Sequence, residues 1–374
     1  MKVIKRYVHV LLILCVVSLL TGCVDRIDLE DATITLMTGI DLNEKDQLLV
    51  YLSSPVFSKE AKDKEEEYGV KIESLRQARG RFDGLVTGLS LSGKIQVFVI
   101  GKKLLEHPDW FPIMDVMFRD ARFTVNARVI VCDGPVKELF NFNPTDKPRL
   151  PLHLTRLLDK ASQRNLTVTT RLQEFHRQMF EKGGTPLLAE INSGRSVKVL
   201  GTALLNKGGK YAALLEPRDT MLLQMLRHQK QGETSLTLPL PVNGGSNHIA
   251  RDRLSFLVNG VNRSVKTSYR NNRFQFDVKM KIRISITERL FLFDMEQDYR
   301  KMEQMISEEL RKEFANLVTK CQESGTDPFG FGVYARAYEY EEWKKVQEDW
   351  PAAFARADVR IVPEVSIIGD GVIK

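Results

Sequence analysis

The chain of 374 residues is longer than one hydrophobic core usually serves, so we expect two or three domains. Its 43% apolar and 28% charged residues are ordinary for a globular protein and argue against a disordered stalk. The formal net charge of +7 falls to +4 without the three basic residues of the first six positions, and no dense Lys/Arg block follows. Nucleic acid is therefore not an expected partner.

The N-terminal segment has the layout of a secretory signal peptide. Three basic residues precede an apolar run over residues 8–20, which is too short to span a bilayer. Residues 20–23 read Leu-Thr-Gly-Cys, which resembles the lipobox of bacterial lipoproteins. The resemblance implies cleavage after residue 22 and diacylglycerol on the thiol of Cys23, where two or more acyl chains anchor a protein stably to a bilayer. The alternative is a plain export signal, or an uncleaved anchor, that happens to end in cysteine.

Two further cysteines, Cys132 and Cys321, belong to the part of the chain expected after cleavage. Each lies in an apolar patterned segment, and nearly two hundred residues separate them. We therefore expect two buried free thiols, with a single disulfide as the alternative.

The first half of the chain alternates between strand and helix patterns. Residues 33–41 alternate in polarity and lead through a polar turn into an apolar segment at 48–52, which predicts a hairpin. Beyond the hairpin, the spacing of apolar residues predicts helices at 75–89, 110–118, 152–162 and 172–180 and strands at 95–100, 123–132 and 187–191. This order is typical of a small α/β unit with helices on a sheet. Residues 192–194 (Asn-Ser-Gly) predict a domain boundary.

The second half is richer in strands. A glycine-containing turn predicts a hairpin of 197–205 with 211–215, and Glu216-Pro217 opens a helix. Strict alternation over 274–286 predicts a strand with one buried face, preceded by a strand that includes 254–256. Residues 295–321 carry an apolar stripe at helical spacing, which predicts a long helix that covers this sheet. A docking groove is the alternative for that methionine-rich stripe. A shorter helical stretch at 341–354 and a last strand at 358–368 follow.

These patterns predict an α+β fold with several domains, mixed or antiparallel sheets each covered by helices, and three domains in all. The expected division is a lipoprotein signal peptide at 1–22, an N-terminal region of two α/β subdomains at 23–194 and a C-terminal α+β domain at 195–374.

The sequence offers no motif for catalysis. It has no His-Glu-x-x-His pair for a zinc site and no Gly-Lys-Ser/Thr phosphate loop. Residues 88–92 (Gly-Leu-Ser-Leu-Ser) nearly copy a nucleophile elbow but end in serine, and they fall at the end of a helical pattern, so a helix end is the preferred interpretation. We expect no enzyme activity, no catalytic residue, no metal and no cofactor.

Several separated segments of the chain match the motifs of one known family. Near the start these are Cys23-Val24-Asp25-Arg26 and Gly39-Ile40-Asp41. In the middle they are 95–101, 118–120, 123–126 and 201–203. The most specific match is Asp327-Pro328-Phe329-Gly330-Phe331-Gly332, followed by Trp343-Lys344-Lys345, Trp350 and Ala357-Asp358-Val359. In order and spacing these segments resemble the Ger(x)C family, the lipoprotein C subunits of nutrient germinant receptors in spore-forming bacteria, although that family typically has Trp in place of Val24.

The resemblance implies a non-catalytic subunit of three α+β domains on the outer face of the spore inner membrane. It would assemble with a multi-spanning A subunit and a permease-like B subunit. Cys23 would be the lipid site, and Asp25, Arg26, Asp327, Phe329 and Trp343 are candidate contact or structural positions. For Asp327 to Gly330 the preferred interpretation is a rigid turn, in which Pro fixes φ and Phe fills a pocket.

Two other classes of protein stay open at this point. A solute-binding lipoprotein of an importer shares the lipobox but predicts two lobes of repeated strand-helix units. An envelope hydrolase would need a nucleophile and a base in one cleft, which the motifs do not supply.

Overall fold

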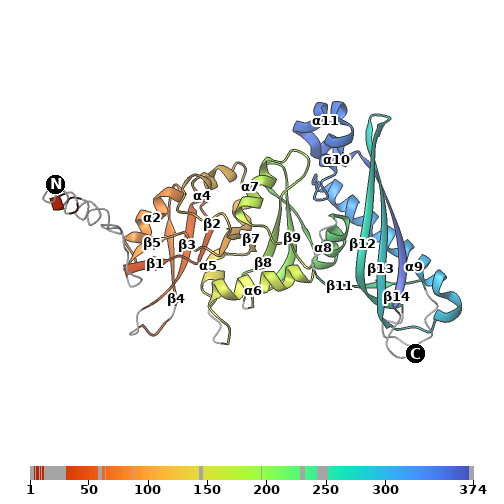
Figure 1. Cartoon of the computed structure of the whole chain (residues 1–374), viewed down its shortest axis with the longest axis horizontal. Coiled ribbons are helices and arrows are strands. Elements are labelled where there is room, and N and C mark those ends of the chain that lie inside the picture. Colours follow the sequence, from red (N-terminus) through yellow and green to blue (C-terminus); the bar gives the residue numbers. More distant parts are fainter. Residues whose placement is uncertain are drawn as a thin grey trace.

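The computed structural model describes residues 31–57, 61–63, 65–86, 88–142, 146–194, 196–227, 232–241 and 252–369, together with residues 4, 6, 7, 9 and 11. The described body is elongated, with an eight-stranded sheet toward one end and a four-stranded sheet at the other (Figure 1). None of the helices in these ranges is both long enough and apolar enough to cross a bilayer.

The eight-stranded sheet is mixed. Its central strands β2, β6, β7 and β8 are parallel, whereas β3, β4, β9 and β10 add antiparallel pairs at the two sides. The predicted hairpin is confirmed, with Met37 opposite Ser53 and Leu42 opposite Leu48. In spatial order the strands are β10 (Tyr211–Leu215), β9 (Val199–Leu205), β8 (Leu187–Asn192), β7 (Arg128–Asp133), β6 (Val97–Gly101), β2 (Met37–Leu42), β3 (Leu48–Pro55) and β4 (Glu65–Lys71).

Helices cover both faces of this sheet because its central strands are apolar on both faces. In β6, Phe98 and Ile100 face one core, whereas Val97 and Val99 face the other. The first core is closed by α2 (Leu75–Asp83), α3 (Lys102–Glu106), η2 (Phe111–Met114), α4 (Asp115–Arg119) and α7 (Leu172–Phe180). The second core is closed by α5 (Val136–Phe140) and α6 (Leu150–Gln163).

Four local expectations in the first half need correction. The predicted strand at 33–41 is divided into β1 (Ala32–Ile34) and β2, because β1 leaves the large sheet and pairs in parallel with β5 (Leu89–Leu91). The predicted helix at 75–89 ends at Asp83, so residues 88–92 are not a helix end but contain this short strand. The predicted helix at 110–118 is a 3-10 turn followed by α4, and the predicted strand at 123–132 starts only at Arg128.

The four-stranded sheet has the order β11 (Thr234–Pro239), β12 (Arg253–Arg270), β13 (Arg273–Arg289) and β14 (Asp358–Gly369). The strands β12 and β13 form one long hairpin, whose turn residues Asn271 and Asn272 both have positive φ, as a tight hairpin turn requires. The last strand runs parallel to β13, because the chain returns through a crossover of helices. The sheet is therefore mixed, within the predicted fold class.

The crossover begins with α9 (Met295–Glu323), which lies along the buried face of the four-stranded sheet (Figure 1). Its stripe from Met302 to Cys321 is buried in the core, so core packing is confirmed for that part, whereas Tyr299 is exposed. The crossover continues with α10 (Phe331–Tyr338), α11 (Tyr340–Val346), η3 (Gln347–Asp349) and α12 (Trp350–Ala355). Both Cys132 and Cys321 are buried and free, as predicted.

The predicted boundary at 192–194 falls between β8 and β9, two strands that pair with each other in the eight-stranded sheet. The helix α8 (Pro217–Arg227) then connects this sheet to the second one. The core of the C-terminal half includes Leu187 and Leu204 of the large sheet and Leu222 of α8. The sheet thus contains strands from both sides of 194, and the division at that residue stays a prediction.

Candidate functional site

The predicted site residues fall into two groups. Cys23, Asp25 and Arg26 lie outside the described residues, so their roles stay predictions. Asp327 and Phe329 lie in the turn between α9 and α10, and Trp343 lies in α11. This second group is brought together where the helices α10 to α12 meet the large sheet.

Asp327 organises the turn before α10. Its side chain is fully buried. One carboxylate oxygen accepts a hydrogen bond from the Gly330 amide at 2.9 Å, and the other accepts from the Gly332 amide and the Trp350 indole, both at 2.8 Å. Burial raises the pKa of Asp327 above its ordinary value, although these three donors act in the opposite direction. The geometry is that of a rigid turn, with Gly330 at a φ of 76°.

Phe329 and Trp343 are also buried. The ring of Phe329 lies 5.3 Å from that of Phe331 and 6.2 Å from that of Phe354, measured between centroids. Trp343 is 3% exposed, and the guanidinium of Arg336 lies 5.4 Å from its ring centroid. These side chains pack the C-terminal helices together, and none of the three predicted positions presents a broad exposed surface.

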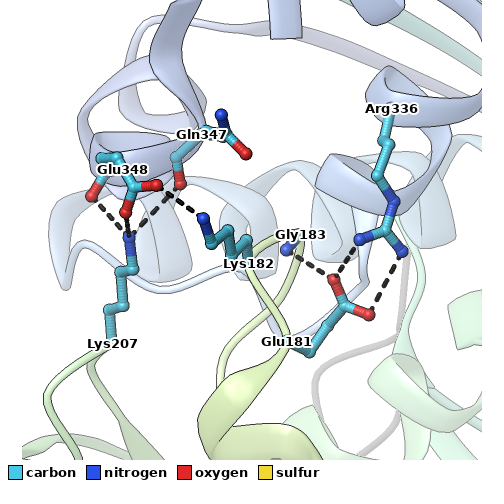
Figure 2. Close-up of polar contacts among 7 residues, drawn as sticks. All are labelled: Glu181, Lys182, Gly183, Lys207, Arg336, Gln347 and Glu348. Atoms are coloured by element: carbon cyan, nitrogen blue, oxygen red, sulfur yellow. Dashed lines mark hydrogen bonds and ion pairs between the residues drawn. The ribbon is translucent and has the colours of Figure 1, made fainter. Parts of the chain in front are cut away.

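Charged residues connect these helices to the large sheet, as Figure 2 shows. We call this region the junction: the loop 181–185 between α7 and β8, the turn 206–210 between β9 and β10, and the segment 327–350. Arg336 donates to both carboxylate oxygens of Glu181, at 2.9 and 3.2 Å. Lys182 lies 2.6 Å from the Glu348 carboxylate, and Lys207 donates to the Glu348 carbonyl at 2.6 Å. Opposite charges thus meet across the junction at two places.

The electrostatics of Glu181 follow from its position. Burial raises the pKa of its carboxyl, but the Gly183 amide and Arg336 outweigh burial and leave this pKa below the ordinary value. The amide of Gly183 donates to Glu181 at 2.9 Å, so the same carboxylate shapes the loop and binds α10. Glu181 is therefore ionised at neutral pH and contributes to the junction as an anion.

Two glycines allow the backbones to meet. A Cβ atom on Gly183 would lie 2.6 Å from the Val333 nitrogen, and one on Gly332 would lie 2.6 Å from the Gly183 Cα. Both distances are too short for a side chain. Next to them, the Thr185 amide donates to the Asp327 carbonyl at 3.1 Å. The loop 181–185 and the start of α10 thus touch directly.

This arrangement is suited to fixing the relative position of two sheets. Its charged groups are engaged with one another, and its aromatic groups are packed inside. Within the described ranges, no group of three His, Cys, Asp or Glu side chains is placed to hold a metal ion.

The sequence patterns missed the charged residues of the junction: Glu181, Lys182, Lys207, Arg336 and Glu348. Glu181 and Arg336 are separated by 155 positions, and nothing local in either segment indicates its partner. The only feature of the sequence near them that drew notice was the pair of glycines at 183–184 after a predicted helix. Such a pair indicates a turn, but it does not indicate which segment packs against that turn.

Comparisons with known proteins match the chain over most of its length. The family model described as "Spore germination protein N-terminal domain" matches residues 25–193, and the model described as "Spore germination B3/ GerAC like, C-terminal" matches residues 200–371. YfkR of Bacillus subtilis (strain 168) is 19% identical over 387 aligned positions, which cover 97% of this chain and 96% of that protein. The spore germination protein GerQC of Bacillus cereus is 19% identical over 375 positions, which cover 98% and 99%.

The fold is also similar to a solved structure. The crystal structure of the GerBC protein superposes with a TM-score of 0.55 at 16% identity, and the match covers 88% of this chain and 96% of that one. Both halves of the chain thus match spore germination proteins in the same order. The chain belongs to the spore germination GerAC-like protein family.

Proposed function

We propose that this protein is the lipid-anchored C subunit of a nutrient germinant receptor and that it acts by assembly with other subunits rather than by catalysis. The observation that carries the proposal is the pair of family matches, which follow each other over residues 25–193 and 200–371 and so cover nearly the whole chain after the predicted signal peptide. The partners are a multi-spanning A subunit and a permease-like B subunit, on the outer face of the spore inner membrane.

The described body supports a role as a rigid, oriented subunit. Seven residues lie between Cys23 and Asp31, so the tether is at most roughly 28 Å long when fully extended. The strand β1, which starts at Ala32, lies at one end of the elongated body and the four-stranded sheet at the other (Figure 1). A lipid on Cys23 would therefore keep the eight-stranded sheet near the membrane and present the long β12–β13 hairpin away from the anchor. Asp25 and Arg26 would contact neighbouring subunits at the membrane surface.

The anchor is tested in spores. We expect both Cys23→Ala and a deletion to abolish or strongly slow nutrient-triggered release of dipicolinate for at least one nutrient, while a trigger that bypasses nutrient receptors still works. Cys15→Ala is the matched control, because it removes a cysteine from the apolar run without touching the lipobox, and it should behave like the wild type. Unchanged release with every nutrient, in the deletion as well as in Cys23→Ala, would contradict the proposal.

The alternative of a solute-binding lipoprotein gives the opposite pattern. In that case the purified full-length protein would bind a small nutrient tightly and the deletion would slow uptake of that nutrient rather than germination. Co-purification of the A and B subunits with this protein from spore membranes, and its loss in a variant that carries Asp25→Ala and Arg26→Ala, supports assembly. Recovery of the protein without either subunit under mild detergent would argue against it.

A further inference from the structure

A small cleft lies beside the junction. It has a volume of about 100 Å³ and is bounded by α7, by the end of α8, by the loop 181–185 and by the turn at Asp327. Its charged lining consists of Arg177, Arg227, Glu181 and Asp327, and Thr185 adds a hydroxyl. The cleft therefore touches both sides of the contact between the large sheet and the C-terminal helices.

The guanidinium of Arg227 is the unusual charge of this cleft. It is partly buried, and burial lowers its pKa below the ordinary value for arginine. Among the described residues, no carboxylate lies within ion-pair distance of it, and no side chain or carbonyl accepts a hydrogen bond from it. A partly buried cation without a hydrogen-bonded partner is costly, because desolvation is not compensated.

The carboxylates around Arg227 are already engaged. Glu174 forms a bidentate pair with Arg177, at 2.9 and 2.7 Å. Glu181 pairs with Arg336, and Asp327 accepts three N–H groups. A second arginine, Arg263, approaches Arg227 from the long hairpin and donates to the Leu226 carbonyl and the Tyr334 hydroxyl. Glu174 and Asp327 attract the charge of Arg227, but none of these neighbours forms a hydrogen bond or an ion pair with it.

Thr185 supplies an independent observation. Its side chain is only 7% exposed and lines the cleft. Its hydroxyl has no hydrogen-bond partner within the part of the chain that the structure describes. Buried hydroxyls are nearly always paired, so an unpaired one at a cleft indicates a missing acceptor. The neighbouring Gln178 does not fill this place, since its amide is used by Glu174 and by the Leu187 backbone.

From these two unpaired donors we propose that the cleft binds a small oxyanion, a carboxylate or a phosphate group. The guanidinium of Arg227 provides a positive charge and two N–H donors in one plane, and the oxygens of a carboxylate or phosphate can accept both hydrogen bonds. The Thr185 hydroxyl provides a third hydrogen bond. The volume excludes a large ligand, because sites for drug-sized molecules enclose about 300–1,000 Å³. A bound oxyanion would connect α8 to the loop 181–185 beside the Asp327 turn and so stabilise the junction. This inference goes beyond the assembly role and does not depend on it.

The test uses the full-length protein in detergent, titrated with sodium phosphate and with sodium acetate, against sodium chloride at matched ionic strength and pH. Isothermal titration calorimetry and the thermal unfolding midpoint report binding, since a ligand that binds only the native state raises this midpoint. We expect saturable binding of at least one of the two anions. Saturation by phosphate alone identifies a phosphate site, and saturation by acetate alone identifies a carboxylate site.

Variants assign the binding to the cleft. Arg227→Gln should weaken it by about tenfold or more, since a charge-assisted hydrogen bond is lost, and Thr185→Val by a few-fold. The matched control is Arg311→Gln, which removes an exposed arginine that pairs with Glu308 on α9 and should leave the affinity unchanged. The thermal unfolding midpoint in sodium chloride shows whether each variant is folded. If Arg227→Gln does not fold, the isosteric variant Thr185→Val still tests the cleft. No saturable effect of either anion, or equal affinity in wild type, Arg227→Gln and Thr185→Val, would overturn the proposal.

Discussion

Arg336 of α10 and Glu181 of the loop before β8 are separated by 155 positions in the sequence, yet two hydrogen bonds of 2.9 and 3.2 Å join their side chains. The pair joins the C-terminal helices to the eight-stranded sheet. It lies beside the close contact of Gly183 with Gly332, so electrostatic and steric features coincide at one place.

The Glu181–Arg336 pair should show a measurable coupling energy. The side chains are 22% and 39% exposed, so solvent screens the pair, and its geometry is bidentate. A double-mutant cycle with Glu181→Gln and Arg336→Gln should give about 0.5–1 kcal/mol in the free energy of unfolding. The exposed Glu308–Arg311 pair on α9 is the reference and should give no more than about 0.5 kcal/mol. Equal couplings for the two pairs would show that the junction pair is an ordinary surface contact.

The contribution of Glu181 should depend on pH in a defined direction. Its pKa is lowered in the folded protein from an ordinary value of 4.5, so its stabilisation is present above pH 4.5 and is lost as the pH falls through the lowered pKa. The loss in the free energy of unfolding caused by Glu181→Gln should therefore become smaller as the pH is lowered from about 6 to the pH at which the protein unfolds in acid. Chemical denaturation at several pH values measures it, with the exposed Glu44→Gln as control. A difference that grows on acidification would contradict the geometry.

Substitution of Gly183 tests the backbone contact. A Cβ atom at this position would approach the Val333 nitrogen to 2.6 Å, so Gly183→Ala must displace the loop or α10 and should cost about 1–3 kcal/mol in unfolding free energy. Gly80→Ala is the matched control, because a Cβ on this glycine of α2 would meet nothing within 4 Å. It should stabilise the protein by up to about 1 kcal/mol through helix propensity. If Gly183→Ala left the free energy of unfolding unchanged, the loop 181–185 would be able to move away from α10 at little cost, which would contradict this prediction.

The carboxylate of Asp327 should be essential for the stability of the C-terminal helices. In Asp327→Asn the amide nitrogen replaces one acceptor and faces an N–H donor, so we expect a loss of about 2–3 kcal/mol in unfolding free energy. Asp277→Asn, on the exposed face of β13, is the control and should stay within about 0.5 kcal/mol of the wild type. Near-UV circular dichroism would follow the surroundings of Trp350, whose indole donates to the Asp327 carboxylate. Equal effects of the two substitutions would reject this role for Asp327.

Local patterns in the sequence determined the elements of the C-terminal half. The alternation from Phe274 to Ile286 predicted a half-buried strand, and the stripe over residues 295–321 predicted the helix on it. The elements β13 and α9 confirm both, with the stripe buried from Met302 to Cys321. The turn at Asn271-Asn272 was equally readable, since two asparagines between strands favour the positive φ observed there. For the candidate site, the sequence indicated the Asp327 turn but not its surroundings.

Only the tertiary structure decided how these elements combine. The pairing of β1 with β5, the parallel direction of β14 and the continuation of the large sheet into β9 and β10 all depend on contacts between distant residues. The same is true of Glu181 with Arg336 and of the unpaired Arg227 and Thr185 at one cleft. Periodicity reports which face of a segment is buried but not which segment buries it, because that choice follows from packing over the whole chain.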